Sequence, residues 1–132
     1  MTTFLCDTNI LSELTRKQPN PGVSAWAQDV SSIAVSVVTV EEIAYGLAWK
    51  PNPRIRDWFA DFLRDYSEVL PITEEIAARS GRLRGTLQAK GRPRTQADML
   101  IAATAQFHGL TLVTRNARDF EDCGISLLDP FR

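Results

Sequence analysis

The sequence of 132 residues predicts one α/β domain built on a parallel sheet of about five strands. Short, nearly continuous apolar runs, such as residues 4–6 and 33–38, are typical of strands buried on both faces. These runs alternate with stretches of helical periodicity, which favours right-handed βαβ winding. The length suits a single hydrophobic core, so we assign residues 1–132 to one domain.

The elements of the first half follow from local patterns. After the strand at 4–6, a short amphipathic helix ends in the turn-rich stretch 18–22, and a second helix is expected from about 23 to 30. The strand at 33–38 leads into Thr39-Val40-Glu41-Glu42, a capping signature that predicts a helix start at Thr39.

The second half continues the alternation of helices and strands. Residues 54–66 carry large apolar side chains at helical spacing, a face that either covers the core or meets a partner. A strand is expected at 69–72, and Thr73 and Thr95 each open a helix, the second of which Gly109 ends. Strands at 110–114 and 125–128, separated by a polar turn, complete the sheet.

Composition excludes several classes of protein. No apolar run approaches the roughly 20 residues that cross a bilayer, and the N-terminus lacks the pattern of an export signal. We therefore expect a cytoplasmic protein that does not associate with a membrane. Two cysteines suit reduced thiols better than a disulfide framework, and we interpret Cys6 as a buried apolar residue and not as a nucleophile.

Charge is unevenly distributed along a chain of net charge −1. Residues 79–94 contain no acid and six basic residues, namely Arg79, Arg82, Arg84, Lys90, Arg92 and Arg94. This run is either a solvated helix face or a local phosphate-binding patch.

Four acids from distant segments are expected at one edge of the sheet. In right-handed winding, helix N-termini lie at the same edge as the carboxyl ends of the strands. Asp7 follows the first strand, Glu42 and Asp98 begin helices, and Asp119 lies in the turn after the fourth strand. Helix capping explains each of the last three acids about as well as function does, but it does not explain Asp7.

Carboxylates brought together in this way need protons or a cation, because two charges about 4 Å apart repel by roughly 4 kcal/mol at an effective dielectric of 20. Oxygen ligands favour Mg²⁺ or Mn²⁺ over zinc, and we interpret His108 as a helix-end residue and not as a ligand. Thr8, Asn9, Thr114 and Asn116 would orient the carboxylates or hold water. The residues alone thus predict metal-dependent phosphoryl or phosphodiester chemistry.

Four motifs in this order carry a family resemblance, namely Leu5-Cys6-Asp7-Thr8-Asn9, Glu42-Ile43-Ala44-Tyr45-Gly46, residues 97–105 around Asp98, and Val113-Thr114-Arg115-Asn116 followed by Asp119-Phe120. Each motif alone is weak. Together, over essentially the whole chain, they resemble the PIN-domain ribonucleases of the VapC and FitB type, which are toxins of bacterial type II toxin–antitoxin pairs.

The resemblance implies a three-layer PIN-like fold and an endoribonuclease dependent on Mg²⁺ or Mn²⁺. It implies that Asp7, Glu42 and Asp98 hold the metal with a fourth group, for which the sequence offers Asn116 or Asp119, and we favour Asp119. Adjacent helix positions point about 100 degrees apart, so only one of Glu41 and Glu42 can face the pocket. The family motif favours Glu42 as the metal ligand.

The resemblance also implies partners. It implies a homodimer and a cognate antitoxin whose C-terminal segment blocks the acidic pocket, with the face at 55–66 and the helix from Thr73 as contact surfaces. The arginines of the basic run, namely Arg79, Arg82, Arg84, Arg92 and Arg94, would guide RNA.

Two other functions compete with a toxin ribonuclease. A phosphatase of the haloacid-dehalogenase type also uses an Asp at a strand end but needs a second Asp two residues later, where Asn9 stands. The other is a catalytically silent module of the same fold that binds a metal or a protein. RNA cleavage that depends on metal and on Asp7 separates these possibilities.

Overall fold

A computed structural model describes residues 2–132. In that range the chain forms strands β1 (Phe4–Cys6), β2 (Ile33–Ser36), β3 (Ser67–Leu70), β4 (Thr111–Val113) and β5 (Leu127–Leu128). The helices are α1 (Thr8–Leu14), α2 (Pro21–Gln28), α3 (Val37–Trp49), α4 (Pro53–Asp65), α5 (Glu74–Ala89) and α6 (Gln96–His108), with a 3-10 turn η1 (Ala117–Phe120).

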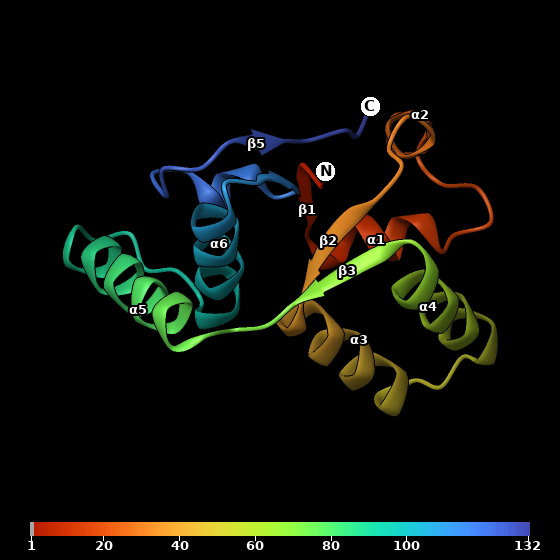
Figure 1. The fold of residues 1–132 in the computed structure, drawn as a ribbon, viewed down its shortest axis with the longest axis horizontal. Helices are drawn as coiled ribbons and strands as arrows, with labels where there is room; N and C mark the ends of the chain where they lie inside the picture. The colour runs from red at the N-terminus through yellow and green to blue at the C-terminus, as the bar shows by residue number, and fades with distance from the viewer. Residues whose placement is uncertain (1) are drawn as a thin grey trace.

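The strands form one parallel sheet in the order β3-β2-β1-β4-β5. Leu5 of β1 lies opposite Ala34 of β2 on one side and Leu112 of β4 on the other. The predicted α/β fold with a parallel sheet of five strands is therefore confirmed, with β1 at the centre of the sheet (Figure 1).

Helices cover both faces of the sheet, as expected for a three-layer fold. Alternate strand residues point to opposite faces. Leu5 and Ala34 belong to a core cluster with residues of α5 and α6, whereas Cys6 and Val35 join a second cluster with residues of α1 to α4. Figure 1 shows α5 and α6 on one side of the sheet and α1, α2 and α4 on the other.

The start of α3 differs from the prediction. Strand β2 ends at Ser36, whose hydroxyl accepts a hydrogen bond from the Val38 N–H and caps the helix, so the predicted cap at Thr39 is wrong. The β-branched residues Val37 and Val38 extend the strand pattern in the sequence, but an earlier cap and the packing of the helix override this weak preference. Thr39 is instead a buried residue inside α3.

The other helix caps agree with the prediction. Thr73 and Thr95 each accept a backbone N–H three residues later, from Ile76 and Asp98. Gly109 ends α6 in the left-handed conformation, at φ 66°, which favours glycine. The boundaries of the remaining elements shift by a few residues, and the last strand is shorter than the predicted 125–128.

The apolar face predicted at 54–66 mainly covers the core. Phe59 of α4 is buried, and Ile55, Trp58 and Phe62 pack against the second core cluster. Tyr66, which follows the helix, remains 61% exposed.

Both cysteines are free and buried, as expected for reduced thiols. Burial raises the pKa of the Cys6 thiol, helped by the neighbouring charge of Asp7, so Cys6 is an apolar core residue and not a nucleophile. Across residues 2–132, no helix has both the length and the apolar character needed to span a bilayer.

Candidate functional site

An open cavity of about 530 Å³ lies at the carboxyl end of β1. The chain leaves the neighbouring strands β1 and β4 in opposite directions here. After β1 it continues to β2 on one side of this pair, and after β4 it continues to β5 on the other side. Such a switch point in strand order is where open α/β sheets bind ligands. The cavity is lined by Asp7, Thr8, Asn9, Ser12, Glu13, Arg16, Glu42, Asp98, Arg115, Asn116 and Phe131.

Asp7 is the most deeply placed carboxylate of this cavity, with only 6% of its surface exposed. Its Oδ1 accepts the Thr8 N–H at 2.8 Å, and its Oδ2 accepts the Thr114 hydroxyl at 2.9 Å and the Asn9 amide at 3.3 Å. Burial raises the pKa of Asp7, and the charge of Glu42 adds to this, while the three hydrogen bonds oppose it. A bound cation would offset the cost that burial places on the ionised form of this carboxyl.

Asn9 and Thr114 tie the end of β1 to the loop after β4. The Asn9 Oδ1 accepts the Arg115 N–H at 3.2 Å, and the Thr114 Oγ1 accepts the Asn116 N–H at 3.0 Å. Thr114 is fully buried behind Asp7, whereas Asn9 and Asn116 reach the cavity. These contacts fix the orientation of Asp7.

Glu42 reaches the same cavity from the second turn of α3. Its Oε1 accepts the Thr8 hydroxyl at 2.8 Å, and that hydroxyl also lies 3.0 Å from the hydroxyl of Thr39. Since α3 begins at Val37, Glu42 is beyond the first helical turn, and capping does not explain it. Glu41 and Glu42 are both exposed, but only Glu42 lines the cavity.

Asp98 lines the cavity from the first turn of α6. Burial raises the pKa of its carboxyl, as do the charges of Asp7 and Asp119, while a hydrogen bond with Thr95 and the charge of Arg94 oppose the shift. The three acids Asp7, Glu42 and Asp98, which are widely separated in sequence, therefore share one cavity. The charge of Glu42 helps to raise the pKa of Asp7, and the charge of Asp7 helps to raise that of Asp98.

Asn116 and Asp119 differ in their position. Asn116 lines the cavity, whereas Asp119 is exposed on η1 and is not among the lining residues. The charge of Asp119 nevertheless helps to raise the pKa of Asp98. The backbone carbonyl of Asp119 accepts the Arg94 Nε–H at 3.0 Å, and Arg92 pairs with Asp122. Both arginines therefore fasten the loop that carries Asp119.

The remaining arginines of the basic run lie on α5, away from the acids. Arg79 pairs with Glu75 at 3.4 Å, and it lines with Arg82 a separate cavity of about 340 Å³. Arg84 is also on α5.

Four charged or aromatic residues that line the acidic cavity were missed by reasoning from sequence, namely Glu13, Arg16, Arg115 and Phe131. Asn9, Ser12, Glu13 and Arg16 have the i, i+3, i+4, i+7 spacing of one helix face, which was an available signal. Arg115 stands within the Thr114-Arg115-Asn116 motif. Phe131 arrives by tertiary packing and carries no local signal.

The oxygen donors of this cavity suit a hard divalent cation. Among residues 2–132, no three His, Cys, Asp or Glu side chains are gathered closely enough to hold a metal ion unaided, so the acids are less crowded than the sequence suggested. Mg²⁺ does not need such a cage, because it usually keeps several waters and binds one or two carboxylates. Asp7, Glu42 and Asp98 supply that chemistry in a cavity with room for water.

The fold and the site together define a class of protein, a parallel α/β domain with an acidic cavity at the switch point of its sheet. Residues 4–125 match the PIN domain family. The chain is 32% identical over 136 residues to the VapC ribonuclease Y4jK of Sinorhizobium fredii, with 97% of each chain covered.

Solved structures agree with this match. The crystal structure of FitAcB from Neisseria gonorrhoeae superposes with a TM-score of 0.83 at 31% identity, covering 97% of this chain and 98% of that chain. DNA-bound VapBC from Salmonella typhimurium gives a TM-score of 0.84 at 30% identity, covering 98% of both chains. The protein therefore belongs to the PIN domain family.

Proposed function

We propose that the protein is an endoribonuclease dependent on Mg²⁺ or Mn²⁺, and that it acts as the toxin of a type II toxin–antitoxin pair. The observation that carries this proposal is the meeting of Asp7, Glu42 and Asp98 in one cavity at the switch point of the sheet. Full-length similarity to a VapC ribonuclease supports RNA as the substrate.

The residues of the cavity have distinct roles in this proposal. Asp7, Glu42 and Asp98 hold the cation, and Asp119 acts as the fourth acid from the edge of the site. When bound, such an ion stabilises charge on a phosphate and lowers the pKa of a water molecule. Thr8 orients Glu42, and Thr114 and Asn9 orient Asp7, by the hydrogen bonds that they donate. Asn116 offers an amide to the substrate or to water.

The partner of the proposed toxin is an antitoxin protein. Structural relatives include FitAB and VapBC bound to DNA, which supports a cognate antitoxin for this chain. We also propose that the toxin forms a homodimer, as the family resemblance implies. A small reading frame with a DNA-binding N-terminal region next to the gene is expected. Co-expression of its product should suppress RNA cleavage.

The direct test is incubation of the purified protein with RNA. We expect cleavage in Mg²⁺ or Mn²⁺ that stops in excess EDTA and returns when the metal is restored. Asp98→Asn should abolish cleavage while circular dichroism reports an unchanged fold. A folded Asp98→Asn variant that cleaves at the wild-type rate would contradict the site.

A catalytically silent module is the second candidate, because the carboxylates of residues 2–132 form no ready-made metal cage. Metal binding by the wild-type protein without any RNA cleavage would favour it.

A further inference from the structure

One wall of the acidic cavity is basic. Arg16 and Arg115 line it together with Phe131, in the same cavity as the three carboxylates. The Arg115 guanidinium lies over the Phe131 ring at 4.7 Å from its centroid. Arg16 is only loosely paired, at 3.5 Å from Glu13, and Arg115 forms no ion pair with any residue between 2 and 132. Both guanidinium groups are therefore available to an anion in the cavity.

The stack between Arg115 and Phe131 suits a phosphate. A guanidinium group that lies on an aromatic face keeps its N–H donors in its own plane, where they can bind two phosphate oxygens. RNA entering a cavity of carboxylates meets repulsion between like charges, and a basic wall offsets this repulsion for the phosphates beside the reacting one.

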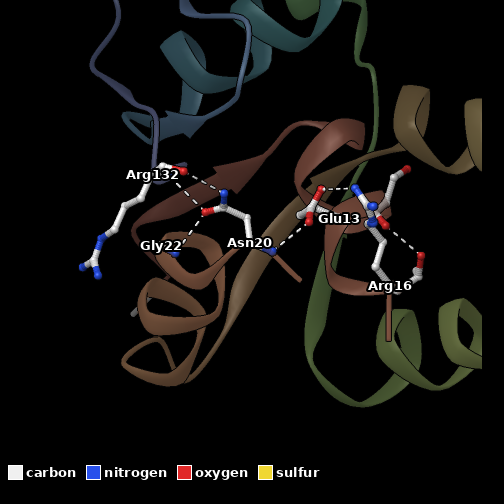
Figure 2. Close-up of polar contacts among 7 residues, drawn as sticks. Glu13, Arg16, Asn20, Gly22 and Arg132 are labelled. Carbon is white, nitrogen blue, oxygen red and sulfur yellow. Dashed lines mark hydrogen bonds and ion pairs between the residues drawn. The ribbon is translucent and has the colours of Figure 1, made fainter. Parts of the chain in front are cut away.

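Phe131 is held in place because its neighbours Pro130 and Arg132 contact Asn20 and Gly22, which we call the seat. The Asn20 side chain accepts the Arg132 N–H at 3.1 Å and donates to the Arg132 carbonyl at 3.0 Å, as a neighbouring strand would (Figure 2). The backbone N–H of Asn20 donates to the buried Glu13 carboxylate at 2.8 Å. The segment 130–132 is thus tied to α1, which ends two residues before Arg16.

Gly22 completes this seat. A Cβ atom added at Gly22 would lie 2.1 Å from the Pro130 carbonyl oxygen and 2.6 Å from the Arg132 Cγ, so any side chain would displace the segment. Close approach, and not an unusual φ, requires glycine here. Figure 2 shows Gly22 and Asn20 facing Arg132.

We propose that Arg115, stacked on Phe131, and Arg16 form a subsite for the RNA phosphate next to the cleaved bond, and that the seat of Asn20 and Gly22 positions it. This proposal rests on the ribonuclease function above. Arg115 and Arg16 are the binding groups. Phe131, Asn20 and Gly22 are positioning residues, which act through Arg115.

The test measures binding of a fluorescent single-stranded RNA oligonucleotide by anisotropy at several salt concentrations. The full-length Asp98→Asn protein serves as the background, so that no cleavage interferes. We expect Arg115→Ala to weaken binding about tenfold, as removal of one charge-assisted hydrogen bond does. The slope of log K against log salt should fall by about 0.7 for each phosphate that the protein no longer neutralises. Arg115→Lys should keep the slope but bind less tightly.

A pair of glycine variants tests the seat without touching the cavity. Gly22→Ala should weaken RNA binding as Arg115→Ala does, whereas Gly81→Ala, where an added Cβ meets nothing within 4 Å, should bind as the background protein does. Since Gly22→Ala risks misfolding, Phe131→Leu provides a second variant that keeps an apolar side chain but removes the ring. In the active protein, Phe131→Leu should raise KM and leave kcat nearly unchanged.

The results separate this proposal from the ribonuclease function. No metal-dependent cleavage by the wild-type protein would overturn the function itself. Wild-type cleavage with unchanged KM and salt slope in both Arg115→Ala and Phe131→Leu would overturn the subsite alone. The subsite would also be overturned if Arg115→Ala bound RNA as before but no longer bound an oligo-glutamate peptide. In that case Arg115 would bind an acidic protein segment and not RNA.

Discussion

Asp7 and Asp98 are held in a site that disfavours their ionised form. Burial raises the pKa of both carboxyls, and each also senses the charge of another acid in or beside the cavity. An acid with a raised native pKa favours the folded state most below the unfolded pKa of about 3.9. That contribution is lost as the pH rises through the native pKa. Above the native pKa of each carboxyl, its ionised form therefore lowers the stability of the metal-free fold.

Replacement of Asp98 by Asn should change stability in a pH-dependent way. In EDTA, Asp98→Asn should gain stability relative to the wild type as the pH rises from 4 to 8, by about 1 kcal/mol, a typical size for a single substitution. The reason is that the amide carries no charge that burial penalises. Urea denaturation of both proteins at several pH values measures this difference. A difference that does not depend on pH would contradict the assigned environment of Asp98.

Asp119 and Asn116 are distinguished by their effects on metal dependence. If Asp119 is the fourth acid, Asp119→Asn should raise the metal concentration that gives half-maximal cleavage by about 10- to 100-fold, as loss of a supporting carboxylate does. Asn116→Ala should change this concentration much less. Cleavage rates across a range of Mg²⁺ concentrations provide the measurement. The opposite order of effects would assign the role to Asn116, which lines the cavity.

At the scale of elements, α3 delivers Glu42 because its cap is Ser36. The helix begins directly after β2, so that its second turn faces Thr8 and the end of β1. Had the helix begun at Thr39, Glu42 would lie in the first turn, where a capping role would explain it. The true start removes that explanation and leaves the cavity as the environment of Glu42.

Loss of the Ser36 cap should destabilise the protein. Ser36→Ala removes the hydrogen bond to the Val38 N–H and should lower the free energy of unfolding by about 1 kcal/mol. Glu41→Ala changes an exposed residue of the same helix that takes no part in the cap, and it should have a much smaller effect. Chemical denaturation with urea compares the two variants. Equal stability of Ser36→Ala and the wild type would argue against this helix start.

Local signals predicted most elements but not their exact ends. The caps at Thr73 and Thr95 and the stop at Gly109 lie next to clear helical patterns, so their chemistry was readable. The boundary at Ser36 was not, because Val37 and Val38 continue the apolar pattern of the strand. Packing of α3 against the sheet, which a local pattern does not contain, decides that boundary.

At the scale of the whole molecule, topology makes the site. The strand order places β1 in the centre and β4 beside it, and the loops that leave these two strands open a cavity between them. Four acids, namely Asp7, Glu42, Asp98 and Asp119, were predicted to share this edge because helix N-termini and strand carboxyl ends coincide in parallel α/β folds. The first three line the cavity, whereas Asp119 lies outside its lining. General rules of chain winding were therefore sufficient to bring the three acids together.

The same rules did not predict the basic wall. Phe131 and the seat at Gly22 depend on how residues 130–132 cross the start of α2, where distant parts of the chain meet. Arg115 was visible in its motif, but its stacking on Phe131 was not. Interactions of this kind follow from tertiary packing and leave no periodic signal in the sequence.

The central claim is that acids from remote segments act as one metal site for RNA cleavage. Glu42→Gln and Glu41→Gln test it most directly, since these neighbours differ in whether they line the cavity. The measurement is the initial rate of RNA cleavage as a function of Mg²⁺ concentration, with folding checked by circular dichroism. We predict that Glu42→Gln loses about a hundredfold or more in rate, the scale on which removal of one catalytic group acts, and that Glu41→Gln cleaves like the wild type. Equal rates in the two variants, or a greater loss in Glu41→Gln, would contradict the account.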